Sequence, residues 1–225
     1  MTGLDAAEAI DAYLVTGGLP PLVTAWKPGQ PVADYLADGL STSVSTLVVS
    51  GERVLSSEFP AETQAKDVLR AIGADARTFT AIGQAAQVDQ RASLSRSLDV
   101  LVDRRVVAVD EPLSANPAHH KRYRIEDPYM RFWLAFLHDA PDLIDAGRGE
   151  LVTRRIERGW STWRGRAVEP VVRRLPWEKA LDVALAVPPA PTLRTGVQGR
   201  RRRWTCRCGP SSSENGDVRR LDQVA

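Results

Sequence analysis

The stretch RYRIEDPYMRFWLAFL, residues 122–137, changes its pattern twice within one short segment. Its first four residues, Arg-Tyr-Arg-Ile, are typical of a strand, which the following Asp-Pro pair ends. Asp127 is suited to be a helix N-cap, and Pro128 to the first helical turn, where the missing N–H of proline is harmless. The segment then places aromatic side chains at helical spacing: Tyr129, Phe132, Trp133 and Phe136. It predicts a strand that leads directly into an aromatic helix.

Five of the chain's 14 aromatic residues fall between residues 123 and 137, so this aromatic stripe needs a surface to pack against. Burial of an aromatic side chain of this size contributes about 1.5–3 kcal/mol to stability. The stripe can be core at a joint between domains. If it is exposed, it is instead a docking patch of a kind that soluble monomers rarely leave uncovered. We predict that its four residues form an interface, and both interpretations stay open.

Residues 60–126 have the element order of a winged helix-turn-helix. A first helix is predicted over 60–75, and a short second one begins at Thr78 or Thr80. The third helix has Asp89 available as its N-cap. Its apolar residues recur at the i, i+4, i+7 and i+8 positions of an amphipathic helix: Leu94, Leu98, Leu101 and Val102. Two strands separated by a polar turn follow, and the second is the Arg-Tyr-Arg-Ile run.

The N-terminal region is helical as well. A helix is predicted from about Asp5 to Val15, because Gly17-Gly18 provides a permissive stop and Pro20-Pro21 forbids continuation. Two short helices are predicted over residues 32–40 and 45–55. The second of these is ambiguous with a strand, since it contains several β-branched residues.

The end of the chain has a different composition. From Leu193 onward it carries eight Arg and three acidic residues, whereas the remainder has a net charge of −3. Its apolar residues are too scattered to form a face, which predicts a segment disordered in isolation. Cys206 and Cys208 form no disulfide framework and lack partners for a zinc set. The composition also suits a frameshift near residues 175–190, a hypothesis that the DNA sequence tests directly.

Nothing in the sequence predicts a membrane partner. No apolar run approaches the roughly 18 residues of a membrane helix. The first residues include acids where a signal peptide needs basic side chains. We therefore expect a cytoplasmic protein.

Three stretches resemble the C-terminal half of the archaeal-type ATPases, a branch of the AAA-like P-loop proteins. They are YLVTGGLPPLV (13–23), VLRAIGADARTFTAIG (68–83) and the opening stretch. The resemblance covers roughly residues 5 to 175. It implies a small helical lid, then a winged helix, then the start of a nuclease-like domain.

The chain departs from this family in its catalytic parts. The nucleotide-binding module would precede residue 13, and no G-x-x-x-x-G-K-[ST] motif is present to hold ATP and magnesium, the parent family's cofactors. The resemblance also makes Glu169 an acidic residue of the nuclease-like domain, but no Glu-x-Lys on strand-like sequence follows it. We expect no cofactor in this chain and no ATP hydrolysis.

Pattern and resemblance together predict a mainly α fold in four parts. These are a helical lid-like region at 1–59, a winged helix-turn-helix with a two-stranded wing at 60–126, a helical extension with the aromatic helix and the remnant of a nuclease-like domain start at 127–187, and a disordered Arg-rich tail at 188–225.

Double-stranded DNA is the first candidate partner, because a winged helix places its third helix in the major groove and its wing on the backbone. The candidate DNA-binding residues lie on that helix and on the wing: Gln90, Arg91, Ser93, Arg96, Ser97, His119, His120, Lys121, Arg122 and Arg124. Acids at positions 89, 99 and 103 dilute the positive field of the helix.

Two alternatives of other classes stay open. The chain can be a protein-docking module for a separate ATPase domain, and ion pairs from Arg91 or Arg96 to nearby aspartates would favour this. It can also be a truncated product without independent activity. Catalysis is disfavoured, because the sequence offers no nucleophile and base at a recognisable spacing.

Overall fold

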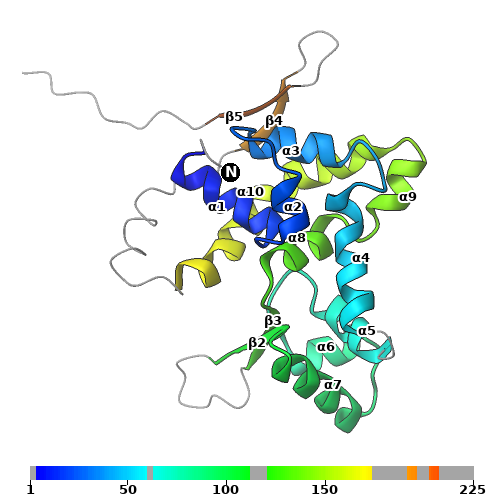
Figure 1. The fold of residues 1–225 in the computed structure, drawn as a ribbon. Coiled ribbons are helices and arrows are strands. Elements are labelled where there is room, and N and C mark those ends of the chain that lie inside the picture. The colour runs from blue at the N-terminus through cyan, green and yellow to red at the C-terminus, as the bar shows by residue number, and fades with distance from the viewer. Residues whose placement is uncertain (1–3, 60–62, 112–120, 174–191, 197–202, 208–225) are drawn as a thin grey trace, which may run out of the picture.

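The computed structural model describes residues 4–59, 63–111, 121–173, 192–196 and 203–207, and these are mainly helical (Figure 1). The helices are α1 (Ala6–Thr16), α2 (Pro20–Thr24), α3 (Val32–Gly39), α4 (Thr46–Glu58), α5 (Thr63–Ile72), α6 (Phe79–Ala85), α7 (Arg91–Asp103), α8 (Pro128–Phe136), α9 (Ala140–Asp145) and α10 (Gly149–Arg173). The strands are β1 (Arg77–Thr78), β2 (Val107–Asp110), β3 (Arg122–Ile125), β4 (Thr192–Gly196) and β5 (Arg203–Arg207).

Capping residues set the ends of the N-terminal helices. Asp5 and Glu8 form a capping box at the start of α1, and Gly17 ends the helix in the left-handed conformation with φ of 59°. The segment that was ambiguous between strand and helix is the helix α4. Its N-cap is Ser45, whose side chain accepts a hydrogen bond from the Val48 N–H.

Helix α8 lies at the centre of the helical body, in contact with α1, α4, α10 and β3. Asp127 caps it by accepting a hydrogen bond from the Met130 N–H at 2.6 Å. The Tyr129 hydroxyl donates to the Leu47 carbonyl at 2.9 Å, and Trp133 Nε1 donates to the Val48 carbonyl at 2.8 Å. Both polar groups of the aromatic side chains are therefore satisfied by α4.

The aromatic stripe is covered by the chain's own helices. Phe132 is fully buried and Trp133 is only 3% exposed, and Tyr129 and Phe136 are buried as well. Phe132 packs edge-on against Trp160 and Trp163 of α10, with ring centroids 6.4 and 5.4 Å apart. In this structure the stripe is core, and its side chains present no surface to an external partner.

Two glycines permit this packing. A Cβ at Gly51 of α4 would lie 2.1 Å from Cδ2 of Trp133, so only glycine admits the indole. A Cβ at Gly17 would lie 2.9 Å from Oδ2 of Asp127 and 3.0 Å from Cβ of Tyr129. The glycine-rich turn after α1 and the start of α8, far apart in sequence, therefore meet directly.

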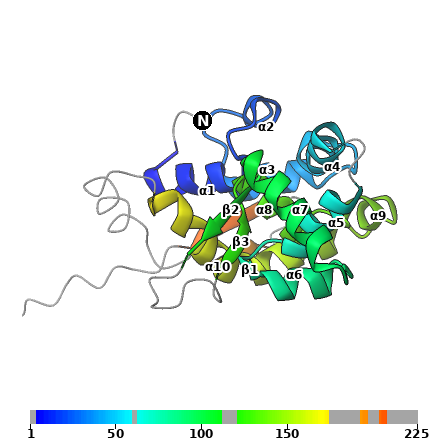
Figure 2. The same cartoon turned by 90° about the horizontal axis from the view of Figure 1, so that it is seen from below.

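A three-stranded antiparallel sheet lies beside α6 and α7 (Figure 2). Its order is β1-β3-β2, with Val107 opposite Ile125 and Thr78 opposite Arg122. We predicted a two-stranded ribbon. The sequence analysis missed β1 because two residues are too few to show the alternation that indicates a strand.

The helices α5, α6 and α7 pack through one apolar face each. The buried side chains are Val68, Leu69, Ile72, Ile82, Leu94, Leu98 and Leu101. Thr78 caps α6 by accepting a hydrogen bond from the Ala81 N–H. The predicted cap of α7 is displaced by one residue: Gln90 stands at the N-cap, without a side-chain hydrogen bond to the helix, and Asp89 precedes it.

Arg131 of α8 joins three segments. Its guanidinium is buried and donates to the carbonyls of Ala74, Ala167 and Arg166 at 3.3–3.4 Å. The Arg166 carbonyl lacks its usual helical donor, because Pro170 stands four residues later in α10 and has no N–H. Arg131 therefore replaces a backbone donor that the proline removes.

Part of the C-terminal tail differs from the prediction. Strands β4 and β5 form an antiparallel pair with Thr192 opposite Arg207 and Gly196 opposite Arg203. The sequence analysis predicted a tail disordered in isolation and did not predict these two strands, whose Thr and Trp content favours strand structure. The rest of the region after Arg173 lies outside the described residues, and so does the proposed frameshift point.

Replacing Gly51 with Ala should lower the free energy of unfolding by about 3 kcal/mol, because the new methyl group overlaps the Trp133 ring. Gly165→Ala in α10 is the matched control. Nothing lies within 4 Å of a Cβ there, so this substitution should raise stability by about 0.5–1 kcal/mol. Urea unfolding of both variants checks the pair, and equal effects would contradict the packing argument.

Arg131→Met and Pro170→Ala should be coupled. Arg131→Met alone leaves the Arg166 carbonyl without a donor and should cost about 2 kcal/mol. With Pro170→Ala also present, the N–H at position 170 can bond to the Arg166 carbonyl, so the same change should cost about 1 kcal/mol less. A double-mutant cycle measured by chemical unfolding tests this, and strict additivity would refute it.

Candidate nucleic-acid interface

Helix α7 presents exposed polar side chains at its N-terminal turn and on the side opposite its buried leucines. Gln90, Arg91 and Arg96 are exposed, whereas Ser93 and Ser97 are half-buried. Across the described residues, neither Arg91 nor Arg96 forms an ion pair with Asp89, Asp99 or Asp103. The two arginines in the first half of α7 are therefore not paired with the aspartates in or next to the same helix.

Local contacts orient the N-terminal turn of α7. The Arg91 guanidinium lies over the Phe79 ring, 5.4 Å from its centroid. The Ser93 hydroxyl donates to Oε1 of Gln64 at 2.8 Å, so it is tied to α5. Arg96 has no such anchor among the residues that the structure describes, which makes its side chain the most adaptable of the three.

The wing residues have unequal access to a ligand. Arg124 is 13% exposed and pairs with Asp110 at 3.1 Å and with Glu126 at 2.6 Å. Lys121 pairs with Glu111 at 2.7 Å, and this hydrogen bond raises the pKa of Lys121 above its ordinary value. Arg122 is exposed on β3. His119 and His120 lie outside the described residues.

The sheet adds one basic residue that the sequence analysis did not include. Arg77 is exposed on β1, opposite Tyr123, next to the Thr78–Arg122 pair. Pairing of β1 with β3 therefore brings two exposed arginines onto neighbouring strands, on opposite faces of the sheet. Only recognition of β1 as a strand could have revealed this, and its sequence carries no such signal.

Among the predicted DNA-binding residues that the structure describes, accessible side chains can be distinguished from Ser93, Lys121 and Arg124, which already have side-chain partners. Gln90, Arg91, Arg96 and Arg122 are exposed, and Ser97 is accessible in part. Arg124 is already paired with the carboxylates of Asp110 and Glu126, so its guanidinium is less available to a phosphate. The exposed group can produce a field attractive to phosphate.

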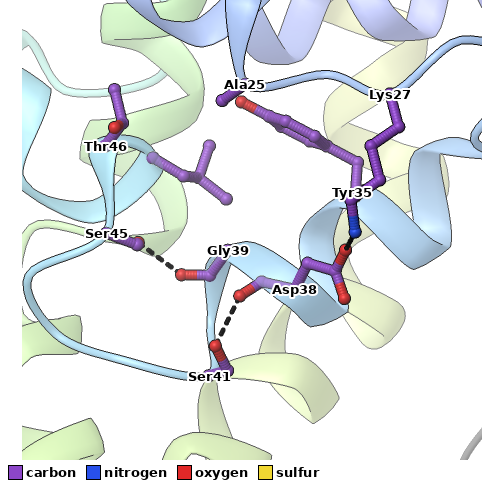
Figure 3. A pocket seen from close by; sticks show the side chains of 9 residues that line it. Ala25, Lys27, Tyr35, Asp38, Gly39, Ser41, Ser45 and Thr46 are labelled. Atoms are coloured by element: carbon purple, nitrogen blue, oxygen red, sulfur yellow. Dashed lines mark hydrogen bonds and ion pairs between the residues drawn. The ribbon is translucent and has the colours of Figure 1, made fainter.

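A separate groove of about 410 Å³ lies between α3 and the start of α4 (Figure 3). Lys27 and Asp38 form an exposed ion pair at its rim, with 2.7 Å between Nζ and Oδ2. This pair lowers the pKa of Asp38. The hydroxyls of Ser41 and Ser45 donate to the carbonyls of Asp38 and Gly39, so neither is hydrogen-bonded to a base that could activate it.

A carboxyl with a perturbed pKa, that of Asp11, is buried between α1 and α10. Asp11 accepts a hydrogen bond from Nε of Arg164 at 2.5 Å, and their side chains are 9% and 2% exposed. Nη2 of Arg164 has no partner among the described residues, so the pair only partly offsets its loss of hydration. Burial outweighs the attraction of Arg164 and raises the pKa of Asp11 to about 6.

The described ranges show two further results. They contain no group of three or more His, Cys, Asp and Glu side chains placed to hold a metal ion. None of their helices combines the length and the apolar character needed to cross a membrane.

Comparison of the chain with protein-family models, with curated proteins and with solved structures finds no match.

The Asp11–Arg164 pair should make stability depend on pH in an unusual direction. Because the pKa of Asp11 is higher in the folded chain than its ordinary 3.8, its contribution is full below about pH 4 and is lost as pH rises through about 6. The unfolding free energy of the wild type minus that of Asp11→Asn should fall by about 2–3 kcal/mol over this window. Urea titrations at several pH values measure the difference, and a flat curve would exclude the effect.

Proposed function

We propose that this chain is a non-catalytic module of an archaeal-type ATPase that binds double-stranded DNA through a winged helix-turn-helix made of α5–α7 and β1–β3. The observation that carries the proposal is topological. The elements follow the order helix, strand, helix, helix, strand, strand, and β3 lies between β1 and β2. This order is consistent with the winged helix-turn-helix proposed here, in which three helices are followed by a wing formed by β2 and β3.

The exposed arginines supply the chemistry for such a role. Arg91 and Arg96 stand on the first half of α7, the part of a recognition helix that contacts base edges. An arginine can donate two hydrogen bonds to guanine in the major groove or one charge-assisted pair to phosphate. Gln90 adds an amide of the kind that pairs with adenine.

The docking alternative has less support. It relied on an exposed aromatic stripe, and those side chains are buried inside the chain. It also relied on Arg91 or Arg96 being consumed by ion pairs with Asp89, Asp99 or Asp103, none of which forms between these described residues. The DNA-binding proposal gives a role to the exposed Arg91 and Arg96, whereas the docking hypothesis gives them none.

The affinity of this module should be modest. Arg124 and Lys121 are neutralised by Asp110, Glu126 and Glu111, which leaves few free cations for phosphates. Non-specific binding grows with the number of phosphates neutralised and weakens steeply with salt. We expect micromolar affinity for duplex DNA at low salt, contributed in part by the Arg-rich tail.

Titration of fluorescent duplex DNA with the full chain tests the proposal. Arg91→Ala/Arg96→Ala should weaken binding about tenfold or more and reduce the salt slope by about one to two. Arg53→Ala/Arg148→Ala, on α4 and before α10, removes the same charge from exposed positions in the helical body. The tail is common to all three proteins. Equal losses in both variants, or no binding by the wild type at low salt, would refute the proposal.

A further inference from the structure

The outer ridge of α7 changes sign along its length. Ala92, Arg96, Asp99 and Asp103 are spaced i, i+4, i+7 and i+11, and all four are exposed. The buried leucines of the same helix occupy the opposite side. The ridge that would enter a groove is therefore positive in its first half and negative in its second.

The two halves would meet different parts of a duplex. At 1.5 Å per residue, Asp103 lies about 10 Å further along the helix axis than Arg96. The major groove is about 12 Å wide, so a helix inserted by its N-terminal turns brings its later turns towards the phosphate rim. A carboxylate at that rim repels phosphates within the Debye length of about 8 Å at physiological salt.

The carboxylates of Asp99 and Asp103 are accessible to an approaching phosphate backbone. Neither carboxylate forms an ion pair within the described part of the chain. Arg104, the next residue, donates to the Glu58 carbonyl at 2.7 Å and lies over the Phe59 ring. Its guanidinium is therefore held towards the end of α4 rather than along the outer ridge.

We propose that Asp99 and Asp103 are specificity-determining residues: they repel the phosphate backbone, so that α7 stays bound only where Arg91 and Arg96 find matching base edges. The inference rests on the proposed DNA binding. Repulsion of this kind lowers the affinity for all sequences by a similar amount, so that at a given protein concentration only a duplex that offers base contacts of about 1–3 kcal/mol each stays occupied.

The test compares the full chain with Asp99→Asn/Asp103→Asn on random-sequence duplex DNA at about 50 and about 200 mM salt. The variant should bind the random duplex about three- to tenfold more tightly at the lower salt, with a smaller gain at the higher salt. When duplexes that bind the variant are selected from a randomised pool, the enriched sequence should also be less defined than the one that the wild type enriches.

Asp142→Asn/Asp145→Asn is the matched control, since it removes the same charge from exposed residues of α9, remote from α7 (Figure 1). An equal gain in this control would assign the effect to net charge and overturn the inference. If the wild type binds but Asp99→Asn/Asp103→Asn binds the random duplex with equal or lower affinity, the inference is overturned as well. The proposed DNA binding would then still stand. If the wild type binds no duplex at low salt, the proposed function fails first and the inference with it.

Discussion

The close approach of α8 to α4 is the constraint on which the rest of the structure depends. Gly51 removes the atoms that would block the Trp133 indole, and α4 carbonyls accept the polar hydrogens of Trp133 and Tyr129. An aromatic residue can be buried at full benefit only when its N–H or O–H also finds a partner. Once α8 is seated in this way, its other faces are free to bind α1 and α10, and a single apolar core runs through the described chain.

The same helix connects the helical body to the unit formed by α5–α7 and the small sheet. β3 leads into α8 through the Asp127 cap, so the strand and the helix cannot reorient independently. Arg131 donates to Ala74 on one side and to α10 on the other, while Arg166 of α10 pairs with Asp75 at 2.9 Å. These contacts are hydrogen bonds and an ion pair rather than apolar packing. Because such contacts are directional, they fix the orientation of α5–α7 relative to α8 and α10. The exposed face of α7 is thereby held at a set position relative to the body.

The charges near α7 show why a count of basic residues is a poor guide to binding. Arg124 and Arg96 are equivalent in the sequence, yet one is enclosed by Asp110 and Glu126 and the other is exposed. A guanidinium that is already paired offers little to phosphate, because a new contact must first break the existing one. The DNA binding proposed above would therefore depend on the exposed cations rather than on the total number of basic residues.

The sequence alone determined the elements whose signals are local. The Asp-Pro start of α8, the Gly17 stop of α1 and the leucine periodicity of α7 each depend on neighbouring residues, and each matches the structure. Only the tertiary structure decided the features that depend on distant partners. Strand β1 exists because β3 pairs with it, the aromatic stripe is core because α4 and α10 cover it, and Arg124 is paired because Asp110 lies on the neighbouring strand. Local spacing records the backbone's preference, whereas burial and ion pairing are set by residues that chain folding brings together.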